Sequence, residues 1–411
     1  MAELNLSRQE GLARLMEGKA PGNAELLGET AVALDSLTGF LTRQYLESYI
    51  PFGGSKIKFI SGLRGSGKTC FAETLLREAD VRSYLTVTVS ACDVWLNDFR
   101  NIYLEIMRQC GLKGILRGCA NRIIREMGYD PCSIPSGKTL MDALAEKGEA
   151  DAFSKGEIRE ALRRNFTRNP LLDNTFALCC SLLTGDMLGY PVLESTYREM
   201  ILAWMHGDPS VKASQMKAIG MTPARVSKFN ARNLLRSLCE VIHLSGRPGL
   251  LVTVDDFEQL IRKGTESGLR YTKARREDAY ESIRQLIDDI DSMRYVLFLF
   301  CLDREMLDDD SVGVKSYQAL WMRMQNEVIS LRFNQFADIV DMDRYGDEHY
   351  SEDRILEMSR KLAEVLAREG LNGSPIGRDV AAQLKTRSEF GKLGIPYMVN
   401  RMTVEGDKEH G

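Results

Sequence analysis

The stretch that decides the fold runs from Lys56 to Phe71 and reads KIKFISGLRGSGKTCF. Its centre satisfies every fixed position of the phosphate-loop pattern G-x-x-x-x-G-K-[ST], with Gly62, Gly67, Lys68 and Thr69. A short apolar strand pattern precedes the glycines and a helical pattern follows them, which is the context that this motif requires. We therefore predict a strand, a glycine-rich loop and a helix that together bind the phosphates of a nucleotide.

Each residue type in this loop has its own physical reason. Glycines let the backbone curl with positive φ, so that its N–H groups point at the phosphates. A helix that starts at Lys68 directs its positive dipole end at the same place. Lys68 reaches the β- and γ-phosphates, and Thr69 offers its hydroxyl to Mg²⁺. The predicted nucleotide-binding segment is Gly62, Leu63, Arg64, Gly65, Ser66, Gly67, Lys68, Thr69 and Cys70.

The tetrapeptide SGKT occurs a second time, at residues 136–139. Here the position five before Gly137 is Cys132, where the pattern requires glycine. No strand pattern precedes this copy, and Pro131 and Pro135 make the approach a stiff turn. We interpret the second copy as the entry to a helix, with no phosphate bound.

A second apolar strand pattern, LLVTVDDFEQL at residues 250–260, ends in acids. Asp255 fits the carboxylate that positions Mg²⁺ at a strand tip. Asp256 stands where many ATPases have a glutamate that orients the attacking water, and Glu258 is the alternative two residues later. A solvated helix cap explains Asp256 and Glu258 equally well. Because no guanine-specificity motif of the N-K-x-D type follows, ATP is favoured over GTP.

Two further residues are candidates for phosphate chemistry. Asp303 follows the buried strand pattern YVLFLFC, at the tip where the AAA+ layout carries a polar sensor of the γ-phosphate. Arg323 comes shortly before the last predicted strand, where AAA+ proteins place an arginine finger that reaches the ATP of a neighbouring subunit. An exposed helix arginine is an equally good interpretation of Arg323.

Apolar strand patterns alternate with helical patterns along the chain, which predicts an α/β fold with a parallel sheet covered on both faces. The five predicted strands are residues 56–61, 83–90, 249–256, 295–301 and 328–333. The long gap between the second and third strands exceeds what a crossover needs, so a large helical insertion is predicted there. The predicted organisation is a helical lead-in (1–50), an AAA+-type P-loop core (51–335) with its insertion at about 95–245, and a C-terminal helical lid (336–411).

Composition excludes several other classes of protein. The chain has 411 residues, 44% hydrophobic and 27% charged, with a net charge of −4, which is ordinary for a soluble protein and argues against a uniformly basic surface. Nine cysteines without a C-x-x-C pair and four histidines give no zinc spacing and fit a reducing compartment. The longest apolar run, residues 295–302, is too short to span a bilayer. We expect a cytoplasmic protein with no membrane partner.

Two basic clusters raise the question of nucleic acid. Arg225, Lys228, Arg232 and Arg236 are spaced to fall on one face of a single helix, which could follow a phosphate backbone. A solvated helix face is the more usual interpretation of such a stripe. The same two interpretations apply to Lys113, Arg117, Arg122 and Arg125.

The chain as a whole resembles the AAA+-type P-loop ATPases of BREX anti-phage defence systems, the BrxC/BrxD family. The resemblance rests on the phosphate-loop and acid-strand segments above and on three others. These are RLMEGKAPGN (14–23), RREDAYESIRQLIDDI (275–290) and DREMLDDDSVGVKSYQALWMRM (303–324), of which Tyr317, Ala319, Leu320 and Arg323 are the more telling group.

The resemblance implies ATP contacts at Gly62, Gly67, Lys68 and Thr69, Mg²⁺ at Asp255 and an arginine finger at Arg323. It also implies a homo-oligomer, a ring or a filament, with ATP at the subunit interfaces. Other defence-system proteins, and DNA by analogy, are the implied partners.

Two departures from the family pattern bear on activity. Asp256 replaces the more usual glutamate, and Tyr397 stands where a sensor arginine would follow a proline, with Arg401 the nearest substitute. These departures leave two alternatives open. One is a slow-turnover ATP-dependent switch or scaffold of the STAND type, and the other is a regulator of the helicase- or transposase-loader type.

Overall fold

The structure, a computed structural model, describes residues 6–222, 224–262, 268–324, 333–388 and 393–405. The chain forms two compact units. The first, here called the sheet unit, comprises Met1–Asn97, Leu251–Ile290 and Leu297–Gly411. The second, the helical unit, comprises Asp98–Leu250 and Asp291–Val296. None of the helices within the described ranges is long and apolar enough to cross a membrane.

The centre of the sheet unit is a five-stranded, all-parallel sheet in the order β2-β3-β4-β1-β5. Its strands are β1 (Ser55–Gly62), β2 (Leu85–Ser90), β3 (Leu250–Asp255), β4 (Val296–Asp303) and β5 (Ile339–Asp341). Strands β1, β3 and β4 are almost wholly buried, as a sheet covered on both faces requires, whereas β2 at the edge is buried at every position but its ends and Thr88. The predicted α/β fold with a five-stranded parallel sheet is therefore confirmed.

The fifth strand differs from the expectation. Residues 325–332, which hold most of the predicted strand at 328–333, lie outside the described residues. The strand that the structure shows is β5, which pairs in parallel with β1 through Phe59–Ile339 and Ile60–Val340. Strand β5 has three residues, of which only Val340 is buried. Its apolar segment is therefore too short to be recognised as a strand in the sequence.

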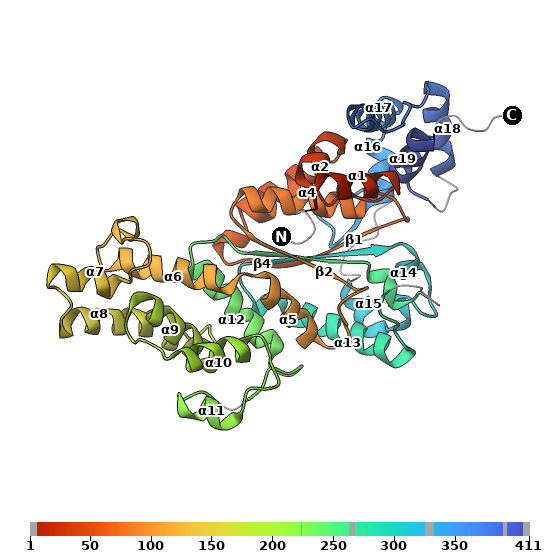
Figure 1. The fold of residues 1–411 in the computed structure, drawn as a ribbon. Helices are drawn as coiled ribbons and strands as arrows, with labels where there is room; N and C mark the ends of the chain where they lie inside the picture. The colour runs from red at the N-terminus through yellow and green to blue at the C-terminus, as the bar shows by residue number, and fades with distance from the viewer. Residues whose placement is uncertain (1–5, 223, 263–267, 325–332, 389–392, 406–411) are drawn as a thin grey trace. The chain divides into compact units, whose positions relative to one another are not determined.

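Helix α4 (Lys68–Val81) covers one face of the sheet, and α13 (Lys273–Asp289) and α15 (Gln318–Met324) lie on the other (Figure 1). Phe71 and Leu75 of α4 are fully buried in the same core as Ile60 and Leu299 of the sheet. Burial of such side chains contributes about 2 kcal/mol each. This packing fixes the start of α4 directly beyond the end of β1.

The lead-in and the lid pack against each other within the sheet unit. The lead-in contains α1 (Arg8–Met16), α2 (Ala24–Thr30) and α3 (Asp35–Leu41). The lid contains α16 (Met342–His349), α17 (Glu352–Arg368), α18 (Arg378–Ser388) and α19 (Ile395–Glu405). A further short helix, α14 (Glu305–Asp308), follows β4 and does not belong to the lid. Leu12, Leu15 and Leu26 of the lead-in form a small core with Leu362, Val365 and Leu366 of α17.

The helical unit is built from eight α-helices in its described part. They are α5 (Phe99–Gln109), α6 (Leu112–Glu126), α7 (Leu140–Lys147), α8 (Ala152–Leu162), α9 (Asn174–Leu188), α10 (Ser195–Met205), α11 (Ala213–Ala218) and α12 (Ala231–Leu244). The second SGKT lies here. Its Thr139 caps α7 in a reciprocal pair of hydrogen bonds with Asp142, and its Lys138 pairs with Glu146. This copy is a helix entry, as predicted.

The predicted basic stripe does not exist as one helical face. Helix α12 begins only at Ala231, so Arg225 and Lys228 precede it. The amide of Asn230 donates to the carbonyl of Arg225 at 3.0 Å and closes a turn there. The prediction of a single face was wrong because spacings of three and four residues align side chains only if the helix is continuous.

Candidate functional site

The sheet unit holds a cavity of about 410 Å³, a size suited to a small-molecule ligand. Three groups of residues line it. The glycine-rich loop contributes Arg64, Gly65, Gly67, Lys68, Thr69 and Cys70. The ends of β3 and β4 contribute Asp255, Asp256, Glu258, Arg262 and Asp303. The lead-in and the lid supply the remaining wall, in which apolar side chains alternate with polar ones.

The loop has the backbone geometry that its glycines allow. Gly65 has φ of 76° and Gly67 has φ of 94°, a region that other residues rarely adopt. At Gly62 a Cβ atom would lie 2.4 Å from the hydroxyl oxygen of Ser66, so a larger residue there would displace the Ser66 side chain. Strand, loop and helix therefore follow one another as the sequence predicted, and the first residues of α4, Lys68, Thr69 and Cys70, line the cavity.

Lys68 is the main cation at this loop and is only 8% exposed. Its Nζ donates to the carbonyl oxygens of Gly62 (3.1 Å) and Leu63 (2.9 Å). The same Nζ lies 2.8 Å from Oδ1 of Asp303. The candidate sensor at the tip of β4 thus contacts the lysine of the loop directly.

Thr69 and Asp255 bring two side-chain oxygen groups together. The Thr69 hydroxyl donates to Oδ2 of Asp255 at 2.9 Å. Burial, and then the neighbouring Asp256 carboxylate, raise the pKa of Asp255 to about 6. In the described parts of the chain no three His, Cys, Asp or Glu side chains are arranged to hold a metal. Mg²⁺ does not need such a set, because it is commonly held by one or two protein oxygens together with phosphates and water. The pair therefore fits a magnesium ion.

The two candidate bases have different surroundings. Asp256 has a left-handed backbone (φ 56°), and its Oδ2 accepts a hydrogen bond from the Ser90 hydroxyl at 2.7 Å. The side chain of Glu258 is 13% exposed and pairs with Arg262 at 2.8 Å. Burial, and then the Asp303 carboxylate, raise the pKa of Glu258 to about 7. Both line the cavity and both have a partner, a neutral hydroxyl (Ser90) for Asp256 and a guanidinium (Arg262) for Glu258.

Three further candidates differ in their relation to the cavity. Arg323 on α15 is not among the described residues that line it, and its Nε lies 2.6 Å from Asp288 on α13. Arg401 pairs with Glu405 and also does not belong to the described lining, whereas Tyr397 does. The structure thus brings together the loop, Asp255, Asp256, Glu258 and Asp303, and leaves Arg323 apart from them.

Residues that the sequence analysis missed hold the start of the loop in place. The backbone N–H of Arg304 donates to the Gly62 carbonyl at 2.9 Å. The Asp343 carboxylate accepts from the backbone N–H of Leu63 at 2.9 Å, and the Arg304 guanidinium pairs with Asp343 at 2.8 Å. Arg304 directly follows the candidate sensor Asp303 in the sequence, and this position could have marked it as a residue of the site. Asp343 lies in no recognisable motif.

The lid also contacts the loop, through its backbone. The N–H of Gly394 donates to the Arg64 carbonyl (2.9 Å), and the N–H of Tyr397 donates to the Gly65 carbonyl (3.1 Å). A Cβ atom on Gly394 would lie 2.4 Å from the backbone nitrogen of Ser66. The lid segment 393–397 thus occupies two carbonyl groups of the loop and follows its backbone too closely for a larger residue at 394.

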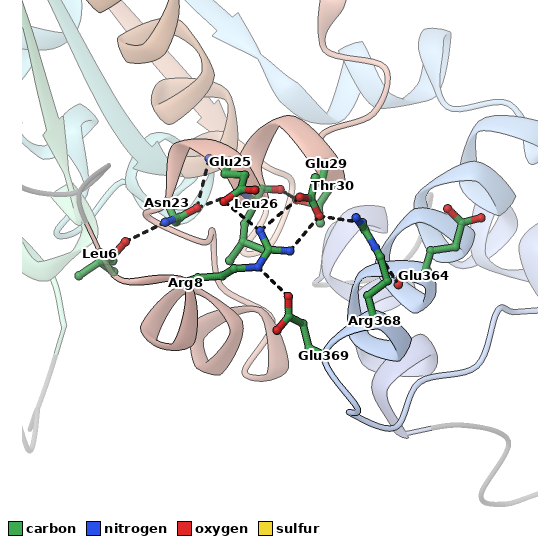
Figure 2. A network of polar contacts seen from close by, with 10 residues as sticks. All are labelled: Leu6, Arg8, Asn23, Glu25, Leu26, Glu29, Thr30, Glu364, Arg368 and Glu369. Atoms are coloured by element: carbon green, nitrogen blue, oxygen red, sulfur yellow. Dashed lines mark hydrogen bonds and ion pairs between the residues drawn. The ribbon is translucent and has the colours of Figure 1, made fainter.

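A polar network joins the lead-in to the lid (Figure 2). The Arg8 guanidinium pairs with Glu25 (3.1 Å), Glu29 (3.2 Å) and Glu369 (2.6 Å). Glu29 also pairs with Arg368 of α17 at 2.8 Å. Single ion pairs at a surface contribute little, but several charges in one network hold geometry more effectively. The two segments that wall the cavity opposite the sheet are therefore connected to each other.

Comparison with known proteins identifies one protein family. The model of the family described as "BREX system ATP-binding protein BrxC/D" matches residues 8–394. The match thus includes the lead-in, the glycine-rich loop, all five strands and most of the lid. No curated protein and no solved structure matches the chain.

Proposed function

The chain belongs to the BrxC/D family of BREX system ATP-binding proteins, and we propose that the cavity of its sheet unit binds ATP with Mg²⁺ and hydrolyses it. The observation that carries this proposal is the convergence of four side chains on the glycine-rich loop. Lys68, Asp255, Glu258 and Asp303 all line the one cavity that this loop opens into.

The loop and its lysine would hold the phosphates. Backbone N–H groups at the start of α4 and the Lys68 ammonium group face the position that the β- and γ-phosphates take in a phosphate loop. Lys68 would exchange its contact with Asp303 for γ-phosphate oxygens when ATP enters. Thr69 and Asp255 would hold Mg²⁺, which when bound neutralises charge on the β- and γ-phosphate oxygens.

Glu258 is the residue that we assign as general base. The oxygen of an attacking water bonds to the γ-phosphorus, the bond to the β,γ-bridging oxygen breaks, and the proton of the water passes to the Glu258 carboxylate. A pKa near 7 suits this task, because a base works best when its pKa is close to the working pH. Glu258 would thus take the place of the glutamate that the family pattern has where this chain has Asp256.

Assembly and partners are part of the same proposal. Asp303 stands at the tip of β4, between the strand of the loop (β1) and the strand of the acids (β3), which supports an AAA+-type arrangement. In a homo-oligomer Arg323 would leave Asp288 and reach the ATP of the neighbouring subunit. We propose BREX anti-phage defence as the setting, with other defence proteins and DNA as partners, and a cytoplasmic location.

A specific contact favours a second candidate function, a slow-turnover ATP-dependent switch. The lid is hydrogen-bonded to the loop at Arg64 and Gly65, so entry of a nucleotide and the position of the lid are coupled. A protein of this kind would bind ATP and change the position of its lid with little turnover. The loader-type regulator is a third candidate, without a contact of its own in its favour.

The second SGKT provides a matched control for the test. Initial rates of Mg²⁺-ATP hydrolysis are measured for the wild type, Lys68→Ala and Lys138→Ala. Loss of one preorganised charge at a phosphoryl site costs about a hundredfold or more in rate, so Lys68→Ala is expected to lose at least that much. Lys138→Ala should hydrolyse ATP as the wild type does. Wild-type rates in Lys68→Ala would contradict the proposal, and ATP binding without turnover in the wild type would favour the switch.

A further inference from the structure

The cavity extends from the glycine-rich loop to the space between the lead-in and the lid. The wall there has an apolar part, with Ala31 and Val32 of the lead-in and Met358, Leu362 and Val399 of the lid, beside polar side chains such as Arg14 and Asn400. The apolar part suits the flat base of a nucleotide, and the polar groups beside it then decide which base fits.

Asn400 supplies such a polar atom. Asn400 lines this cavity, and its buried side-chain oxygen Oδ1 accepts no hydrogen bond from any residue that the structure describes. Buried polar atoms are nearly always hydrogen-bonded in folded proteins, and one left unpaired is costly. A ligand with a hydrogen-bond donor at this position would remove that cost.

The place of Asn400 along α19 puts it between the loop and the lead-in. Tyr397, one helical turn earlier, binds the Gly65 carbonyl through its N–H, and a Cβ atom on Gly18 would lie 2.6 Å from its ring. Residues three apart share a helix face, so Asn400 follows Tyr397 along the cavity. The same Cβ atom on Gly18 would lie 3.6 Å from Oδ1 of Asn400. Phosphates at the loop would therefore place the base of the same nucleotide toward Asn400.

We propose that Asn400 reads the base of the bound nucleotide, with Oδ1 accepting a hydrogen bond from the 6-amino group of adenine. This inference rests on the proposed ATP site and adds the residue that sets its specificity. Guanine carries a carbonyl oxygen at this position, and two acceptors that face each other repel. Arg14 lines the same cavity, and its buried Nε, a donor that has no partner among the described residues, would complement an acceptor nitrogen of the adenine ring.

The test compares two ligands on two proteins. Equilibrium binding of ATP and of purine riboside triphosphate, which has hydrogen in place of the 6-amino group, is measured by competition with a fluorescent nucleotide. One hydrogen bond to a buried acceptor corresponds to about tenfold in affinity, so the wild type should bind ATP about tenfold more tightly than the analogue. In Asn400→Leu, which has nearly the same size, the two affinities should become equal.

The analogue also serves as a control for folding, because Asn400→Leu should bind it as well as the wild type does. Asn400→Ala, which removes the amide without adding apolar bulk, should give the same loss of discrimination. An unchanged preference for ATP in both variants would overturn the assignment of Asn400. Equal binding of the two ligands by the wild type would overturn base reading alone, whereas a wild type that binds neither triphosphate would refute the proposed ATP site itself.

Discussion

Replacing Glu258 by glutamine tests the assignment of the general base. Glutamine keeps the size of the side chain and removes its charge and its ability to take a proton. General bases contribute about 10²–10⁴-fold to rate. If Glu258 is the base, as we propose from its burial and its pKa raised to about 7, the chemical step should slow by about 10³-fold. That loss corresponds to about 4 kcal/mol of activation free energy.

Asp256→Asn is the matched control, since it neutralises the neighbouring candidate. The Asp256 carboxylate is held by the Ser90 hydroxyl at 2.7 Å, and an amide oxygen can accept the same bond. We therefore expect a loss of only about threefold in the chemical step, the equivalent of a weakened hydrogen bond.

The assay is single-turnover hydrolysis with protein in excess over radiolabelled ATP, which separates chemistry from product release. Both variants should still bind ATP, which is measured in parallel. The assignment is refuted if Asp256→Asn loses far more activity than Glu258→Gln. Equal and large losses in both would mean that the two carboxylates act as a unit.

Three further predictions follow from individual contacts. Gly394→Ala should weaken ATP binding by about tenfold, because its Cβ would lie 2.4 Å from the loop backbone and displace it; calorimetry that finds wild-type affinity would contradict this. Glu258 has a folded-state pKa raised from 4.5 to about 7, so the nucleotide-free protein should lose stability as pH rises through that window. Thermal melts at several pH values should show a shallower decline for Glu258→Gln than for the wild type. Arg323→Ala should lower turnover of the assembled protein by about a thousandfold and leave ATP binding intact, and full turnover would exclude the finger role.

The parts of the fold that the sequence predicted are those with a strong local signal. Strand β4 begins with seven apolar residues and β3 with three, and such runs have few alternatives to a buried strand. Strand β1 contains two lysines, but it directly precedes the glycine-rich loop, which marked its position. The loop was recognisable because its glycines, Lys68 and Thr69 occupy fixed positions. The second SGKT was rejected for the absence of the same context, and in the structure its Thr139 caps a helix.

The parts that the sequence did not reveal depend on contacts between distant segments. The hydrogen bonds from Gly394 and Tyr397 to the loop are made by backbone groups, which leave no side-chain pattern to recognise. Asp343 binds the Leu63 N–H across the fold, and no local motif marks it. The prediction that Arg225, Lys228, Arg232 and Arg236 share one helix face was wrong because it relied on a local pattern alone. Their regular spacing continues across the turn that Asn230 closes, where the chain is not helical.

Binding of ATP to the intact chain tests the central claim most directly. Isothermal titration calorimetry of Mg²⁺-ATP into the nucleotide-free protein should give one site per chain, and Lys68→Ala should abolish the binding heat. The second-copy variant Lys138→Ala should give the wild-type isotherm. A wild type that binds no ATP, or a Lys68→Ala variant that binds it with unchanged affinity and stoichiometry, would contradict the assignment of the cavity as the nucleotide site.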